Sequence, residues 1–140
     1  MSIISARVNN SQDNHQVTLE TNGKAHSIVI PPKASGFGSS ANGGELLFLA
    51  LATCYCNDIY REAAKRNIVV RSAQVEVAGE FGDVPGNPAE NITYRVIVEA
   101  EAPKADIVDL MKHTDTVAEI QNSLRQATTV TLASVEAVSV

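Results

Sequence analysis

The N-terminal third of the chain alternates between apolar and polar positions, as strands with one buried face do. Residues 15–21 alternate in this way, and the pair Asn22 and Gly23 that follows favours a tight hairpin turn. Alternation resumes in residues 24–30, and residues 3–8 form a further short run with strand character. Together the three segments predict an antiparallel meander with one buried face.

A long apolar helix follows a glycine-rich segment. Residues 33–44 contain four glycines and predict a loop, whereas residues 45–66 predict a helix. The first half of that helix, residues 46–54, is apolar on every side, and the second half carries charged residues. A helix that is apolar all round must be covered. In a chain of 140 residues, we expect this cover to come from a second copy of the chain as much as from a sheet of the same chain.

The second half of the chain returns to strands before it ends in helices and a strand. Strands that occur in blocks, rather than in strict alternation with helices, indicate an α+β fold, and the length fits one domain over residues 1–140. The expected elements are a strand at residues 68–81, a turn at 84–88, a strand at 92–98, a helix opened by Pro103, a second helix opened by a capping box at Thr116 and Glu119, and a final strand at 128–138.

Composition and charge narrow the range of partners. Apolar residues make up 44% of the chain, which is enough for a packed core, and the formal net charge is −5. An acidic balance argues against nucleic acid and against anionic membrane surfaces. Neither a spanning apolar stretch nor a signal peptide is apparent, so a cytoplasmic location is the default expectation.

The two cysteines, Cys54 and Cys56, lie in the predicted long helix. A reactive cysteine must be a partly accessible thiolate near positive charge or hydrogen-bond donors. Asp58 lies one turn after Cys54 and would raise the pKa of its thiol, whereas Arg61 on the same face would oppose that effect. Cys56 points to nearly the opposite side of the helix, so we expect no disulfide between the two and interpret Cys56 as structural.

Metal and cofactor motifs are absent. The three histidines, His15, His26 and His113, do not pair at metal-ligand spacing. His15 and His26 are expected on the surface of hairpin strands, and His113 is placed to cap the end of the preceding helix. We therefore expect no metal and no cofactor.

Two segments resemble the signatures of the OsmC/Ohr family. Residues 43–54 read Gly-Gly-Glu-Leu-Leu-Phe-Leu-Ala-Leu-Ala-Thr-Cys, similar to the family's loop, Glu-Leu-Leu, small-residue helix and cysteine. The second signature is usually Cys-Pro-Val-x-Asn-Ser/Thr-Leu, and residues 118–124 read Ala-Glu-Ile-Gln-Asn-Ser-Leu. The order of elements is also similar, so the resemblance covers nearly the whole chain.

The resemblance implies an intertwined homodimer, in which antiparallel sheets wrap around long central helices and the sites lie at the subunit interface. It also implies reduction of organic hydroperoxides, in which a first cysteine attacks the peroxide, a second closes a disulfide and a dithiol reduces it. By position Cys54 matches the attacking cysteine, and Ala118 stands where the family has the second one. Glu45 matches the glutamate of the broader OsmC-like branch, whereas Gly44 holds the place of the catalytic glutamate of the hydroperoxide-reductase branch.

Three hypotheses follow for this stress-response family. In the first, the protein is a hydroperoxide reductase that acts through Cys54 alone, and an external thiol resolves the oxidised cysteine. In the second, it binds a small apolar or thiol-reactive molecule at the dimer interface without peroxide turnover. In the third, it is a dimeric scaffold with an inert Cys54. Function must be argued from the site rather than from the fold, so geometry decides among them.

Overall fold

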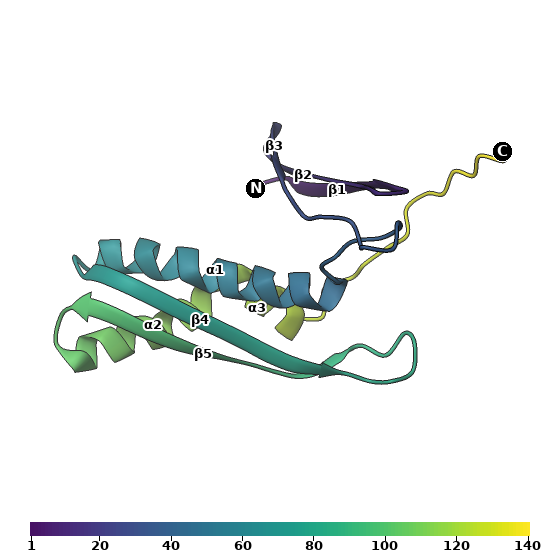
Figure 1. Ribbon diagram of the computed structural model, residues 1–140. Helices are drawn as coiled ribbons and strands as arrows, with labels where there is room; N and C mark the ends of the chain where they lie inside the picture. The colour runs from purple at the N-terminus through teal and green to yellow at the C-terminus, as the bar shows by residue number, and fades with distance from the viewer. The chain divides into compact units, whose positions relative to one another are not determined.

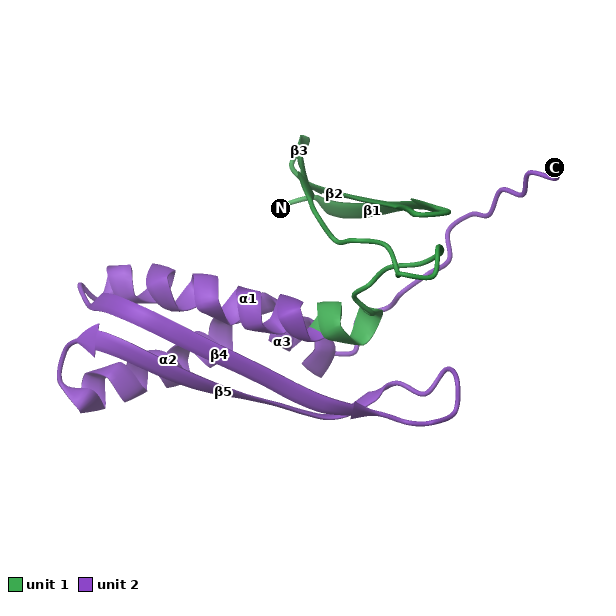
Figure 2. Ribbon diagram, viewed as in Figure 1, with its two compact units in different colours: residues 1–47 green, residues 48–140 purple.

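The computed structural model describes all 140 residues and contains five strands and three helices (Figure 1). Their bounds are β1 Ile4–Ser11, β2 Asn14–Thr21, β3 Lys24–Ile28, α1 Gly43–Lys65, β4 Val69–Phe81, β5 Ala89–Glu101, α2 Lys104–Val117 and α3 Glu119–Arg125. The chain divides into two compact units, Met1–Leu47 and Phe48–Val140, coloured separately in Figure 2. None of the helices combines the length and the apolar character needed to cross a bilayer.

The first unit holds the expected meander. Its three strands form an antiparallel sheet in the order β1-β2-β3, and the β2–β3 hairpin turns at Asn22 and Gly23. Both turn residues have positive φ, 50° and 81°, which a two-residue turn of type I′ requires. The prediction of a tight hairpin at this position is therefore confirmed.

The glycine-rich segment is a loop, as predicted, and it has defined hydrogen bonds. Gly36 and Gly38 adopt φ of 106° and 88°, conformations that strain other residues. The side chain of Asn10 accepts from the backbone N–H of Gly38 at 3.0 Å and donates to its carbonyl at 3.2 Å. The loop is thus attached to β1 through one asparagine.

The second unit is built on the long hairpin of β4 and β5, which pair antiparallel with Val75 opposite Val96. Alternate residues of this hairpin pack against a core formed by α1 and α2. The fully buried members of that core are Tyr55, Ile59, Ala63 and Leu110. The predicted hairpin and the α+β class are therefore confirmed.

Helix α1 confirms the predicted long helix, but its first half is not buried all round in this single chain. Leu51 is buried, whereas Leu49 keeps 57% of its surface exposed. The physical reason is that unit 2 covers one face of α1 only, with the β4–β5 hairpin and α2. The second unit therefore leaves the other face of the first half of α1 uncovered.

Two predicted features at the C-terminal end are wrong. Helix α2 continues through Val117, so Thr116 lies in its last turn and donates from Oγ1 to the His113 carbonyl at 2.6 Å instead of capping α3. Residues 128–138 form no strand, and Val130 is 96% exposed. Their β-branched alternation fits a strand, but a strand needs a neighbour for its backbone hydrogen bonds, and neither sheet of the structure includes these residues.

Candidate functional site

Cys54 lies in the middle of α1 with its side chain half-buried, and two carboxylates face its sulfur. The distance from Cys54 Sγ to Asp58 Oδ2 is 3.7 Å, and the distance to Glu119 Oε2 is also 3.7 Å. At these distances the single S–H of the thiol can donate a weak hydrogen bond to one carboxylate oxygen or the other. The structure thus brings together one thiol and two proton acceptors.

Two elements position these groups. Asp58 follows Cys54 by one turn of α1, so both side chains emerge on the same face. Arg61, one turn further, pairs with Asp58 Oδ1 at 2.9 Å and holds that buried carboxylate in place. Glu119 is the first residue of α3, which brings the start of that helix to the sulfur.

The pKa of the Cys54 thiol is raised above its ordinary value. Burial is the largest cause, and the negative charges of Asp58 and Glu119 add to it. The backbone N–H groups of Ile120 and Glu119 act in the opposite direction, because they stabilise a thiolate at the start of α3. The thiol is therefore mostly protonated at neutral pH, next to groups that can accept its proton.

Asp58 is buried, and its pKa is also raised. Desolvation is the main cause and the charge of Glu119 adds to it, whereas the Arg61 guanidinium lowers it. A carboxylate with a raised pKa is a stronger base than an exposed aspartate. Asp58 can therefore accept the proton of the Cys54 thiol.

The same three side chains are the structure's one group that could supply three metal ligands. Their ligand atoms lie within 4.8 Å of one another. However, one oxygen of Asp58 is already paired with the Arg61 guanidinium, which supplies the positive charge that a cation would bring. The arrangement is a thiol beside two carboxylates, of which Asp58 is ion-paired with Arg61.

Glu45 and Cys56, two further residues singled out from the sequence, lie apart from this group. Glu45 accepts from the Asn42 N–H at 2.9 Å and Asn42 Oδ1 accepts from the Glu45 N–H at 2.8 Å, which makes a capping box at the start of α1. About two and a half helical turns separate Glu45 from Cys54. Cys56 lines a separate cavity of about 240 Å³, and both cysteines are free. A catalytic role for Glu45 stays a prediction.

Ala118, which stands in the place of the family's second cysteine, is fully buried between α2 and α3. It immediately precedes Glu119, whose carboxylate reaches the Cys54 sulfur. At this point of the structure a carboxylate, rather than a second thiol, faces Cys54.

A second charged cluster surrounds Glu62, a buried carboxylate of α1. Lys65 and His113 lie 2.8 Å from its oxygens and Arg61 lies 3.0 Å away. Hydrogen bonds from Lys65, Arg61 and His113 lower the pKa of Glu62 to about 2. The sequence predicted that His113 caps the end of its own helix. In the structure it instead joins α2 to α1 through Glu62.

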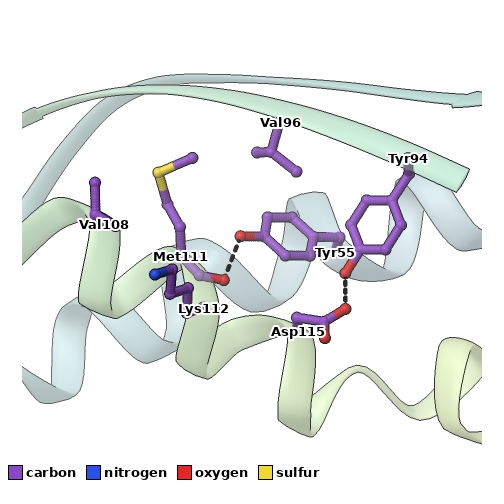
Figure 3. A pocket seen from close by; sticks show the side chains of 7 residues that line it. All are labelled: Tyr55, Tyr94, Val96, Val108, Met111, Lys112 and Asp115. Carbon is purple, nitrogen blue, oxygen red and sulfur yellow. Dashed lines mark hydrogen bonds between the residues drawn. The ribbon is translucent and has the colours of Figure 1, made fainter.

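A cavity of about 450 Å³ lies between α1, α2 and β5 in the second unit (Figure 3). The rings of Tyr55 and Tyr94 meet edge to face in it, with centroids 5.5 Å apart. Their hydroxyl groups donate to the Met111 carbonyl and to the Asp115 carboxylate. Both hydroxyls have partners within the chain, so this cavity presents mainly apolar surface.

The proximity of Glu119 to Cys54 was missed from the sequence, although a signal was present. The family's second signature has proline directly after its cysteine, whereas this chain has Glu119 directly after Ala118. A charged residue at this position was the signal that the surroundings of Cys54 differ from the family's second signature. Only the structure shows that the carboxylate points at the thiol.

The sequence matches the family of OsmC-like proteins over residues 36–133, so the chain belongs to that family. This confirms the resemblance read from the two signatures. A comparison with curated proteins finds no match.

Solved structures show the same fold. An OsmC-like protein from Mycoplasma pneumoniae is 18% identical, with 89% of this chain and 87% of that chain covered and a TM-score of 0.61. An OsmC-like protein of unknown function from Vibrio cholerae is 17% identical, with 88% and 94% covered and a TM-score of 0.60. An OsmC-like hydroperoxide resistance protein from Jannaschia is 14% identical, with 92% and 90% covered and a TM-score of 0.54.

Proposed function

We propose that this OsmC-like protein reduces organic hydroperoxides through the single thiol of Cys54, with an external thiol as the reductant. The observation that supports it is the placement of the Cys54 sulfur 3.7 Å from two carboxylate oxygens, beside the backbone N–H groups that begin α3. The Jannaschia structure is also named an OsmC-like hydroperoxide resistance protein.

The carboxylates supply the proton transfers of the first step. Asp58 or Glu119 takes the proton of the Cys54 thiol, and the thiolate attacks one peroxide oxygen. The O–O bond breaks, Cys54 becomes a sulfenic acid, and the leaving alkoxide takes the proton from the carboxylic acid to become an alcohol. Cys54 is oxidised by two electrons and the hydroperoxide is reduced by two.

The second step needs a thiol from outside the chain, because Ala118 offers none. One external thiol attacks the sulfenic acid, releases water and forms a mixed disulfide with Cys54. A second external thiol attacks this disulfide, which restores the Cys54 thiol and releases the oxidised reductant. A small monothiol or dithiol can perform both steps without a second protein cysteine.

A homodimer is part of this proposal. Only seven apolar residues of the chain are fully buried, whereas 21 large apolar side chains stay exposed. Leu49 on α1 and the alternating segment 128–138 are among the exposed groups. A second copy of the chain would cover them. Sedimentation at low micromolar concentration tests this, and a stable folded monomer would contradict it.

A specific observation also favours a second candidate, binding of a small apolar or thiol-reactive molecule without turnover. The raised pKa of Cys54 leaves little thiolate at neutral pH, and thiolate is the reactive form. A protonated thiol beside two carboxylates reacts slowly with peroxides and can still be modified by a strong electrophile.

Steady-state consumption of cumene hydroperoxide with dithiothreitol, followed from pH 6 to pH 9, separates the two candidates. Peroxide reduction predicts a rate that rises with pH and disappears in Cys54→Ser. Cys56→Ser is the matched control, since Cys56 lies on the same helix and does not face the carboxylates. A rate equal to that of the reductant alone at every pH would refute turnover and favour the binding candidate.

A further inference from the structure

Arg61 joins two buried carboxylates of α1. Its Nη1 lies 2.9 Å from Asp58 Oδ1, and its Nε lies 3.0 Å from Glu62 Oε2. The side chains of Asp58 and Glu62 are 6% and 5% exposed, whereas that of Arg61 is 46% exposed. Asp58 in turn lies 3.7 Å from the Cys54 sulfur. One arginine therefore connects the thiol site to a second buried carboxylate further along the helix.

One ion pair does not fix a half-exposed arginine. The side chain has many rotamers, and a single pair in contact with water contributes little to holding one of them. Two contacts, made through different nitrogens of one rigid guanidinium plane, restrict the side chain much more. Arg61 therefore needs Glu62 as well as Asp58 to keep its charge in this position.

Glu62 is itself held from two helices. Lys65, one turn further along α1, lies 2.8 Å from its Oε2, and His113 of α2 lies 2.8 Å from its Oε1. Hydrogen bonds from Lys65, Arg61 and His113 lower the pKa of Glu62 to about 2, so it stays ionised at neutral pH. Glu62 is thus a fixed negative charge against which the Arg61 guanidinium is aligned.

The charge of Arg61 matters at Asp58 because the other surroundings of that carboxylate oppose its ionisation. Cys54 and Arg61 face it from α1, and Glu119 faces it from α3. Burial and the charge of Glu119 raise the pKa of Asp58, and the Arg61 guanidinium is the positive charge that lowers it. If Arg61 moved away, Asp58 would stay protonated over a wider range of acidic pH, where it cannot accept a proton from the thiol.

We propose that Glu62 is a positioning residue of the thiol site, which holds the Arg61 guanidinium against Asp58 and so sets the pH range over which that carboxylate can accept the thiol proton. The inference rests on the proposed function and deepens it, because Glu62 acts only through the carboxylate that serves Cys54. It also makes the packing of α2 part of the site, since His113 anchors Glu62 from that helix.

The sign of one pKa shift distinguishes positioning from a simple effect of charge. A neighbouring anion raises the pKa of a carboxyl group, so removing the charge of Glu62 would by itself lower the pKa of Asp58. If Glu62 acts by holding Arg61, its removal must raise the pKa of Asp58 instead, because the cation is then free to leave. The two roles therefore predict opposite directions.

The test is the pKa of Asp58 in the full-length protein, followed by NMR of the carboxyl carbon and assigned with Asp58→Asn. Glu62→Met keeps the length of the side chain without an oxygen and should raise that pKa by about 0.5 to 1, because an adjacent cation lowers a carboxyl pKa by about 1–3 and Arg61 is half-exposed. Glu62→Gln disturbs the fold less and keeps a neutral acceptor, so it should raise the pKa by a smaller amount.

Two controls show whether the effect passes through Arg61. Arg61→Met should raise the pKa of Asp58 at least as much as Glu62→Met does, and in the Arg61→Met background Glu62→Met should cause no further rise. Lys65→Met removes a different partner of Glu62, one that has no ion pair with Asp58, and should leave the pKa of Asp58 unchanged.

A pKa of Asp58 that falls or stays unchanged in both Glu62 variants, or a rise that persists without Arg61, would overturn the positioning role. These measurements use no peroxide, which separates them from the proposed function. A protein that shows the expected shifts and does not consume hydroperoxide would refute the proposed function and still support the role of Glu62 at Asp58.

Discussion

Replacing Glu119 with glutamine removes one of the two negative charges that face the Cys54 thiol and keeps the size of the side chain. The sulfur and the carboxylate oxygen are 3.7 Å apart. Because Glu119 is exposed, the dielectric constant of water is the appropriate one, and the repulsion between a thiolate and this carboxylate is about 1 kcal/mol. Glu119→Gln should therefore increase the thiolate fraction of Cys54 at pH 7 by about fivefold.

The assay is the rate of alkylation by iodoacetamide as a function of pH, in a Cys56→Ser background so that one thiol remains. The pH profile is expected to move to lower pH. The rate at pH 7 should rise by about two- to threefold, less than the thiolate fraction, because a more acidic thiolate is a weaker nucleophile. High salt should reduce the difference, since the carboxylate is exposed.

Glu99→Gln is the matched control for this experiment. Glu99 is an exposed glutamate of β5, and replacing it changes the net charge by the same amount without touching the thiol site. It should leave the alkylation profile of Cys54 unchanged. If Glu119→Gln leaves the profile unchanged as well, or moves it to higher pH, the carboxylate does not govern the thiol and the account of the site is wrong.

Three further predictions concern stability and the missing thiol. The pKa of Glu62 is lowered to about 2, so its ion pairs stabilise the fold at neutral pH and are lost as the pH falls from 4.5 towards 2. Glu62→Gln should therefore lower the melting temperature at pH 7. The difference in melting temperature between the two proteins should vanish near pH 2. Gly79→Ala should cost about 1–3 kcal/mol in chemical denaturation, since its Cβ would lie 2.7 Å from Phe48 Cζ. Ala118→Cys should form a disulfide with Cys54 on mild oxidation, detected as a two-dalton loss by mass spectrometry; a free thiol pair after peroxide treatment would contradict the placement of α3.

The fold was largely predictable because local patterns agree with one another. Alternation gave the strands on both sides of α1, and the positive φ values at Asn22 and Gly23 bear out the turn. The wrong predictions, the capping box at Thr116 and the strand at residues 128–138, are those in which the structure of a segment depends on the elements next to it. Thr116 has the spacing of a helix cap, but α2 does not end until Val117, so its hydroxyl bonds within that helix.

The site was predictable only in part. Spacing along one helix placed Asp58 and Arg61 on the face of Cys54, and the structure shows both pairings along that face. The approach of Glu119 depends on how α3 packs against α1, which no periodicity encodes. The same limit applies to residues 128–138, because their strand pattern becomes a strand only beside a neighbour, and neither sheet of the structure includes them.

The central claim is that Cys54 is the thiol that reacts with hydroperoxide, and trapping its sulfenic acid tests this most directly. The Cys56→Ser protein is treated with one equivalent of cumene hydroperoxide in the presence of dimedone at pH 8, and the adduct is located by peptide mass spectrometry. We predict a dimedone adduct on the Cys54 peptide that is absent without hydroperoxide. An unmodified Cys54 that still reacts with iodoacetamide after this treatment would contradict the account.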